Sequence, residues 1–97
     1  GGIAQGFGYA LLEDFNIENG QVKSENFDTY LLPTIKDIPE ITIIGVENPD
    51  QAGPLGAKGI GEPATELAAA AINNALSFAL QTRFNKLPLT LEQVIGL

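Results

Sequence analysis

This chain of 97 residues is long enough for one small domain with a modest core. It carries 12 acidic and 5 basic residues, a net charge of −7, and no apolar run of membrane-spanning length, so we expect neither nucleic-acid nor membrane binding. Cysteine and histidine are both absent, which excludes disulfides, cysteine-ligated iron–sulfur clusters and the usual zinc sites, so we expect no metal ligand in this chain.

Residues 2–15 are predicted to form a helix, because apolar side chains recur along one face at helical spacing. A second face carries Gln5, and four glycines lie among the first eight residues, each costing a helix about 1 kcal/mol relative to alanine. This cost indicates close approach, either to a ligand or to another helix through small residues. The chain starts inside this predicted helix and contains no methionine, so we expect a fragment of a larger chain.

The middle of the chain has the pattern of short strands and turns. Residues 15–24 are predicted to form a β-hairpin around Asn19-Gly20, the strongest two-residue turn signal. Residues 27–32 are predicted to form a short strand or turn, and 33–40 an extended link with two prolines. Residues 40–47, E-I-T-I-I-G-V-E, are rich in β-branched side chains and are predicted to form a strand.

A glycine-rich loop over residues 48–61 leads into the longest predicted helix, residues 63–83, with Arg83 in its last turn. We expect one face of this helix to be buried against a sheet and the opposite face to be exposed. The buried face comprises Ala64, Leu67, Ala68, Ala71, Ile72, Ala75, Phe78 and Ala79, and the exposed stripe Glu66, Asn73, Asn74, Ser77 and Gln81. Thr90 and Gln93 then predict a capping box at a final helical turn.

Glu62 stands at the junction between the glycine-rich loop and the long helix. Pro63 suits the first helical position, and the residue before a proline is biased towards extended backbone, so we expect Glu62 to be an extended N-cap. Glutamate is a poor capping residue by type. Glu62 is therefore either a simple partner of the positive helix end or a carboxylate aimed at something else.

Three familiar motifs do not fit. Residues 59–64 match G-x-G-x-x-A, but no strand precedes them directly and the alternating βαβ pattern is absent, so a dinucleotide site is disfavoured. Lys58 is followed by glycine rather than serine or threonine, so residues 53–58 are no phosphate-binding loop. Nothing in the spacing of the acidic residues singles out a carboxylate pair for glycoside hydrolysis.

The order of several motifs nevertheless resembles a known family. G-G-I-A-Q-G-F-G-Y-A-L-L-E at residues 1–13 precedes Asn19-Gly20, D-T-Y-L-L-P-T, P-E-I and then G-P-L-G-A-K-G-I-G-E-P-A at residues 53–64. An alanine-rich helix and L-P-L-T follow. Over essentially its whole length the chain resembles the C-terminal part of the large, molybdopterin-binding subunit of the xanthine dehydrogenase and aldehyde oxidase family of molybdenum hydroxylases.

The resemblance implies roles for individual residues. Glu62 matches the family's active-site glutamate, a base beside the molybdenum that deprotonates a metal-bound hydroxyl before its oxygen attacks an N-heterocycle or aldehyde. Gln5 and Gly6 match the Q-G motif at the pterin cofactor. Lys58, Gly59 and Gly61 match the loop that wraps the cofactor site. These roles agree with the residue types, since glycine and proline would fix a base in place and glutamine offers both a donor and an acceptor.

Taken together, we expect an α+β fold in which the glycine-rich helix and the long alanine-rich helix pack on a small sheet. Residues 1–97 would form a single fragment of a molybdopterin-binding domain. The resemblance implies a cytoplasmic oxidoreductase whose partners are the rest of the subunit and the iron–sulfur and FAD subunits or domains. We expect the isolated fragment to be inactive, to bind no cofactor and to form homo-oligomers. The alternative is a non-catalytic module that only self-associates or binds a partner chain.

Overall fold

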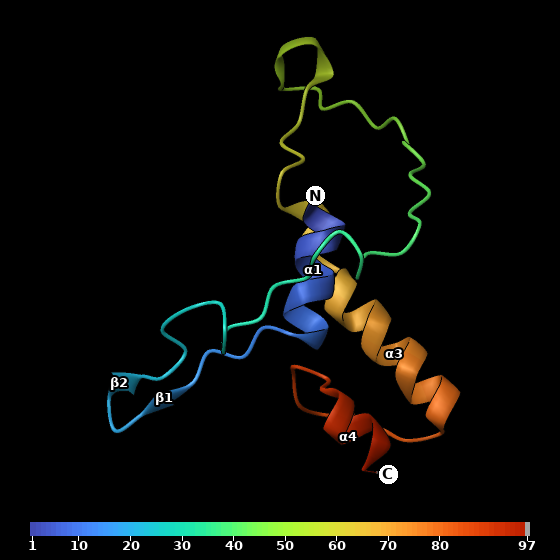
Figure 1. Ribbon diagram of the computed structural model, residues 1–97. Coiled ribbons are helices and arrows are strands. Elements are labelled where there is room, and N and C mark those ends of the chain that lie inside the picture. The colour runs from blue at the N-terminus through green and yellow to red at the C-terminus, as the bar shows by residue number, and fades with distance from the viewer. Residues whose placement is uncertain (97) are drawn as a thin grey trace.

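The computed structural model describes residues 1–96, and helices dominate it (Figure 1). The radius of gyration is 16.8 Å, well above the value of about 13 Å for a compact domain of this length, because two segments project away from the helices. None of the helices in the described range combines the length and the apolarity needed to cross a membrane. The elements in chain order are α1 (Gly2–Leu11), β1 (Ile17–Glu18), β2 (Gln21–Val22), a 3-10 turn η1 (Pro54–Gly56), α2 (Pro63–Glu66), α3 (Ala68–Leu80) and α4 (Leu91–Ile95).

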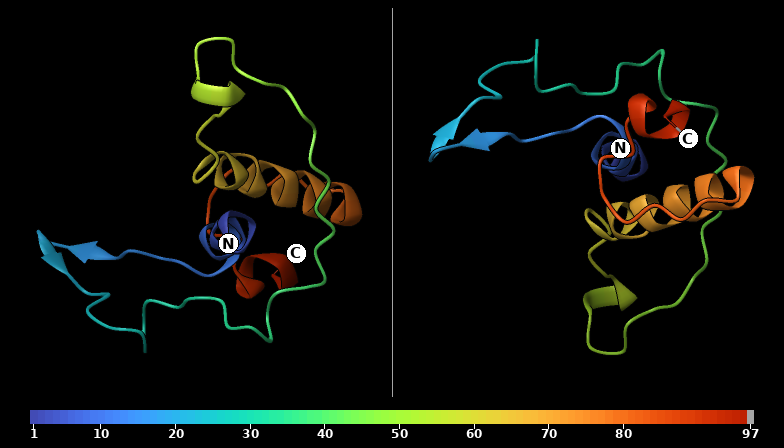
Figure 2. Two further views of the ribbon diagram at one scale, coloured as in Figure 1. Left: turned by 90° about the horizontal axis from the view of Figure 1, so that it is seen from above. Right: turned by 90° about the horizontal axis from the view of Figure 1, so that it is seen from below.

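The helix α1 packs against α2 and α3 through its glycines. Figure 2 shows α1 nearly end-on beside α3. A Cβ atom on Gly2 would lie 2.8 Å from the Cβ of Ala64, and one on Gly6 would collide with the Cβ of Ala68. Only glycine permits this backbone approach, so helix packing accounts for the cost of these two glycines. The predicted small-residue contact between helices is therefore confirmed for Gly2 and Gly6.

The prediction that the first helix extends to residue 15 is wrong, because α1 ends at Leu11. The carbonyl oxygen of Gly8 accepts from the backbone N–H groups of both Leu12 and Glu13, at 2.9 Å each, and the chain then leaves the helix axis. Phe15 lies outside the helix and meets Tyr30 edge to face, with ring centroids 6.4 Å apart. Phe15 therefore matches the apolar period of the helix in the sequence, but its side chain packs against Tyr30 and not on a helix face.

The predicted hairpin is present. Asn19 and Gly20 have φ angles of 52° and 78°, which is the left-handed pair that a tight hairpin turn requires. Ile17 pairs with Val22 in an antiparallel register, and all four strand residues are exposed. The expectation that the helices pack on this sheet is wrong, because the hairpin projects away from them (Figures 1 and 2). The α+β content is confirmed, but the layered packing is not.

The predicted strand at residues 40–47 is also wrong. This segment contains no strand, and its β-branched side chains face solvent, with Ile43, Ile44 and Val46 more than four-fifths exposed. A strand requires a neighbour to take its backbone hydrogen bonds, and the described residues supply none here. The segment crosses α1 and α3 and then swings out as the long loop that is green in Figure 1.

The predicted long helix is divided and shorter than expected. Leu67, with φ −94° and ψ −14°, separates α2 from α3. The helix α3 ends at Leu80, where Gln81 adopts left-handed backbone and the Thr82 N–H donates to the Ser77 carbonyl. The prediction that Arg83 lies in the last helical turn is therefore wrong. A left-handed residue that satisfies the last carbonyls is a common way for helices to stop.

The faces of the long helix are turned relative to the prediction. Leu67 and Phe78, predicted to be buried, are 75% and 80% exposed. Asn73, predicted to be exposed, is half-buried and donates through Nδ2 to the carbonyl oxygen of Phe84 at 3.2 Å, while Ser77 donates to its Oδ1. The chain that follows α3 therefore lies along the side of the helix that carries Asn73, whose amide hydrogen-bonds the Phe84 carbonyl. No sheet in the described range covers the apolar side.

The small core lies where the returning chain meets α1. Ala10 and Leu89 are buried, and the Leu89 N–H donates to the Ala10 carbonyl at 2.7 Å. Thr90 caps α4 by accepting from the backbone N–H of Gln93, as predicted. The reciprocal half of the capping box is absent, because the Gln93 amide donates to the carbonyl of Pro88 instead.

Candidate functional site

Gln5 and Glu62, which lie 57 positions apart in the sequence, line one pocket where α1 meets α2. The pocket has a volume of about 390 Å³, within the range of small-molecule sites. Its lining is Gln5, Tyr9, Glu62, Thr65, Glu66 and Ala69. The fold therefore brings together the two residues to which the sequence assigned the most specific roles.

Glu62 is the N-cap residue of α2, but its backbone is in the helical region at φ −93° and ψ −28° rather than extended as predicted. Its carbonyl oxygen accepts from the Thr65 N–H at 2.9 Å, which closes a tight first turn and offsets the conformational cost of preceding a proline. The Glu62 side chain accepts no capping hydrogen bond. The carboxylate is thus exposed at the pocket and is not used to cap its own helix.

Gln5 projects from α1 towards α2 and meets Thr65. The Thr65 hydroxyl lies 3.1 Å from the carbonyl oxygen of Gly2 and 3.4 Å from Oε1 of Gln5. These contacts fasten the glutamine to the same helical turn that begins at Glu62.

Gly6, the other residue of the Q-G motif, is buried away from the pocket. Its nearest neighbours are the Ala68 side chain and the backbone of Thr65. In this chain Gly6 allows α1 to approach α3, and it acts on Gln5 by setting that helix in place.

Of the remaining predicted residues, Lys58 and Gly59 lie in a neighbouring groove, whereas Gly61 lines neither that groove nor the pocket of Glu62. Lys58 and Gly59 line a cavity of about 590 Å³ beside η1, together with the segment around Val46 and Pro63. Among the glycines of this loop, only Gly56 has a positive φ, at 81°, and Gly59 and Gly61 do not. A Cβ atom on Gly59 or Gly61 would meet nothing within 4 Å. The structure therefore does not bring Lys58 and Gly59 into the pocket of Glu62.

Four pocket residues, Tyr9, Thr65, Glu66 and Ala69, were not assigned to the site from the sequence. Tyr9 lies four positions after Gln5, and Glu66 lies four positions after Glu62, so helical spacing alone could have placed both on the pocket side. Thr65 is recognisable only through its contact with α1, because no local pattern links it to Gln5. Among residues 1–96, no group of three or more acidic side chains is arranged to hold a metal ion.

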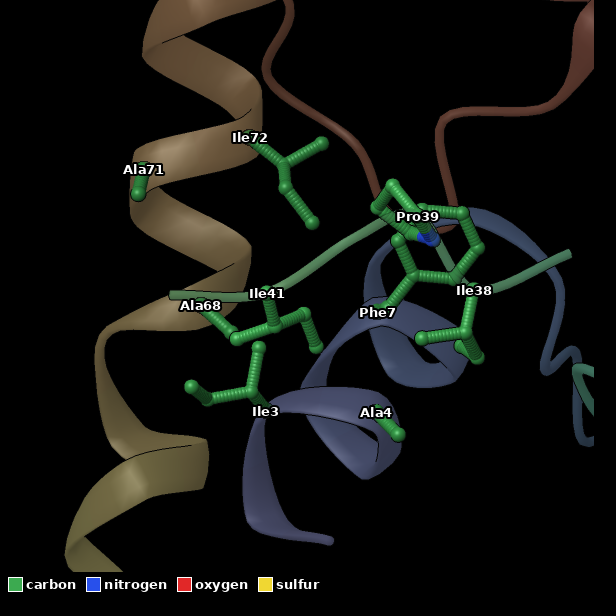
Figure 3. Close-up of a pocket in the computed structure, with 9 residues that line it drawn as sticks. All are labelled: Ile3, Ala4, Phe7, Ile38, Pro39, Ile41, Ala68, Ala71 and Ile72. Carbon is green, nitrogen blue, oxygen red and sulfur yellow. The ribbon is translucent and has the colours of Figure 1, made fainter. Parts of the chain in front are cut away.

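A separate cavity of about 310 Å³ lies between α1, α3 and residues 38–41, as Figure 3 shows. Ile3 and Phe7 from α1 face Ile72 across it, with Ile38, Pro39 and Ile41 along the crossing chain. All nine lining residues are apolar, so the cavity has no side chain able to perform polar chemistry. It lies apart from Gln5 and Glu62 and is not part of the candidate site.

Comparison with known proteins gives one consistent family. Residues 1–39 match the family of molybdopterin cofactor-binding domains. The chain is 36% identical over 95 residues to a probable xanthine dehydrogenase subunit of Bacillus subtilis (strain 168), covering 98% of this chain and 13% of that protein. It is 39% identical over 98 residues to an aldehyde oxidoreductase of Megalodesulfovibrio gigas, covering 98% of this chain and 10% of that protein.

A solved structure agrees with these sequence matches. The crystal structure of quinoline 2-oxidoreductase from Pseudomonas putida 86 superposes with a TM-score of 0.84 at 37% identity. The match covers 98% of this chain and 13% of that chain. The chain thus spans only about one eighth of the length of such relatives.

Proposed function

Because this chain belongs to the xanthine dehydrogenase and aldehyde oxidase family of molybdenum hydroxylases, we propose that it supplies the base and part of the molybdopterin site of such an enzyme. The observation that carries the proposal is the shared pocket of Gln5 and Glu62. The substrate class is an N-heterocycle or an aldehyde, as the names of the related xanthine, aldehyde and quinoline enzymes suggest.

The residues at the pocket fit a bulky polar cofactor. Gln5 offers two amide donors and one acceptor oxygen, which suits the edge of a pterin ring. Ala69 is the smallest side chain of the lining, and the open surroundings of Gly59 and Gly61 leave the loop before Glu62 accessible. The pocket is open on its outer side, so other parts of the subunit would complete its walls. Lys58 and Gly59 would then contact the cofactor from the neighbouring groove, and Gly61 from the loop between the groove and Glu62.

When bound, the molybdenum cofactor supplies the transfer of a water-derived oxygen to a substrate carbon and the uptake of two electrons. The role of Glu62 is to receive, at a carboxylate oxygen, the proton released as that oxygen is added. A base needs a fixed position within hydrogen-bonding reach of its proton. The Pro63 ring and the hydrogen bond from the Thr65 N–H to the Glu62 carbonyl fix the backbone of Glu62. Gln5 binds and orients the cofactor from the opposite wall.

The partners follow from the same proposal. Several relatives are described as subunits, among them a subunit gamma and a large subunit of enzymes from Paenarthrobacter nicotinovorans. We therefore propose that this segment acts within a longer molybdenum-binding subunit. Iron–sulfur and FAD subunits or domains would carry the two electrons away.

The test is Glu62→Gln in the full-length subunit that contains this segment. The change keeps the size of the side chain and removes the base, so we expect kcat to fall by about 10²- to 10⁴-fold, the usual contribution of general-base catalysis. Molybdenum content measured by mass spectrometry should stay at the wild-type level.

Glu92→Gln is the matched control, because Glu92 is an exposed carboxylate in the first turn of α4. It removes the same charge from the start of a different helix. If Glu62 were only a helix-end partner, both variants would lose about 0.3–1 kcal/mol of stability with chemistry unchanged. Turnover by Glu62→Gln at the wild-type rate would therefore overturn the assignment.

A further inference from the structure

Thr65 is the one side chain in the pocket with hydrogen bonds to both the backbone of α1 and the side chain of Gln5. Its hydroxyl lies 3.1 Å from the carbonyl oxygen of Gly2 and 3.4 Å from Oε1 of Gln5. Its backbone N–H donates to the carbonyl of Glu62 at 2.9 Å. A single residue therefore joins the two halves of the pocket, which come from residues 5–9 and 62–69.

The glycines of α1 make this contact possible. A Cβ atom on Gly2 would stand 3.3 Å from the Thr65 hydroxyl oxygen, and one on Gly6 would stand 3.2 Å from the Thr65 carbonyl oxygen. Both distances are tighter than ordinary carbon–oxygen contacts, so a larger residue at either position would push Thr65 away from Gln5. Close packing of the helices thus serves to bring a hydroxyl within reach of the glutamine.

We propose that Thr65 is a positioning residue that holds the Gln5 carboxamide in one orientation. The Thr65 hydroxyl has one proton, shared between two acceptor oxygens, and it faces the oxygen of the carboxamide. The amide nitrogen of Gln5 therefore points away from Thr65 and presents its two N–H donors to the pocket. The ligand recognised there is an acceptor-rich group, and identifying that group as the molybdopterin cofactor rests on the proposed function.

The experiment uses the full-length subunit with Thr65→Val and Thr65→Ser. Valine keeps the shape of threonine and removes the hydroxyl, whereas serine keeps the hydroxyl and loses the methyl group. We expect Thr65→Val to lower the molybdenum and pterin retained through gel filtration by about 3- to 10-fold, the usual value of one hydrogen bond, and Thr65→Ser to retain both. A role in packing alone predicts the reverse order, and that result would overturn the proposal.

A double variant tests whether Thr65 acts through Gln5. Gln5→Ala should lower cofactor retention, and adding Thr65→Val to it should cause no further loss, because the positioned group is gone. Independent, additive losses would overturn the proposal.

The test of Thr65 as a positioning residue can fail independently of the test of Glu62 as the base. If Glu62→Gln loses turnover while Thr65→Val retains its cofactor, only the role of Thr65 fails. If Thr65→Val loses cofactor while Glu62→Gln turns over normally, the role of Thr65 stands and the base assignment fails.

Discussion

The helices and the chain between residues 14 and 60 are stabilised in different ways. The helices α1, α2 and α3 approach each other closely, and hydrogen bonds such as Leu89 N–H to Ala10 carbonyl tie distant parts of the sequence together. The segment from 14 to 60 bonds mainly to itself, as in the contacts of the Ser24 hydroxyl with Asp14 and Asn16. The helices are therefore held together by contacts between distant parts of the sequence, whereas the segment is held mainly by local hydrogen bonds.

This difference divides the candidate site. Gln5, Thr65 and Glu62 lie on the packed helices, and their arrangement is present in this chain alone. Lys58 and Gly59 lie on the projecting segment, where nothing within residues 1–96 orders them against Glu62. Under the proposed function, the first group would be a preformed half-site, and the second group would need surrounding protein before it could meet a cofactor.

The largest expected effect is self-association of the isolated chain, which tests whether the helices or the segment from 14 to 60 present the stronger apolar surface. Leu67, at the N-cap of α3, and Phe78 within it form an exposed apolar stripe, while Ile43 and Ile44 are similarly exposed on the projecting segment. Burying one such side chain stabilises an interface by about 1.5–3 kcal/mol, but the loop must also be ordered on binding. We expect the chain to be oligomeric in sedimentation equilibrium at micromolar concentration.

Two double variants identify the surface responsible. Leu67→Gln/Phe78→Gln should weaken association by at least about tenfold, since even a fraction of the lost burial exceeds about 1.4 kcal/mol. Ile43→Gln/Ile44→Gln should weaken it less. A monomeric parent chain, or a stronger effect from the loop pair, would contradict the view that the helices present the preformed surface.

A smaller effect is expected from adding one methyl group in each region. Gly6→Ala forces a Cβ atom against the side chain of Ala68, and overpacking of this kind costs about 1–3 kcal/mol, more than the gain of up to about 1 kcal/mol in helix propensity. Gly59→Ala meets nothing within 4 Å at ordinary φ and should stabilise the chain by about 0.4–1 kcal/mol.

Urea unfolding followed by circular dichroism measures both changes. A lower free energy of unfolding for Gly6→Ala and a higher one for Gly59→Ala would support the contrast between the packed helices and the open loop. Equal destabilisation by the two variants would show that the loop is as tightly packed as the helices.

Local patterns in the sequence predicted the features that local physics determines. The Asn19-Gly20 turn needs only its own left-handed backbone, and the cap of α4 needs only the Thr90 hydroxyl. The strand expected at residues 40–47 failed because its propensity has no effect without a neighbouring strand. Asn73 was assigned to the wrong face because its bond to the Phe84 carbonyl joins parts of the chain that no helical period relates.

The same distinction applies to the site. The glycine and proline around Glu62 indicated a fixed carboxylate, and the N-cap position of Glu62 is confirmed. The extended backbone expected there is wrong, because the bond from the Thr65 N–H to the Glu62 carbonyl closes a turn. The link between Thr65 and Gln5 spans 60 positions and depends on the packing of α1, which only the three-dimensional structure provides.

The smallest expected effect lies at the junction of the two regions. The Tyr30 hydroxyl donates to Oε2 of Glu13 at 2.6 Å, which ties the projecting segment to the end of α1. This hydrogen bond, with smaller contributions from desolvation and from the negative charge of Glu13, raises the pKa of Tyr30 above its ordinary value of 10.0. A raised pKa in the folded state means that the stabilising contribution is fully present below pH 10.0 and is lost as the pH rises through the folded-state pKa.

The tyrosinate absorbance of Tyr9→Phe, which leaves Tyr30 as the only one of the chain's 2 tyrosines, follows this titration directly. We expect its midpoint to lie above pH 10.0 and to fall towards that value when Glu13→Ala is added, because the acceptor and its charge are both removed. Glu18→Ala, an exposed carboxylate on the hairpin, is the control and should leave the midpoint unchanged. The stabilising effect should be small, because this hydrogen bond between two side chains is only partly buried and is still screened by water. If Glu13→Ala does not move the midpoint, the contact is not maintained in solution, and the projecting segment is then even less tied to the helices than the structure indicates.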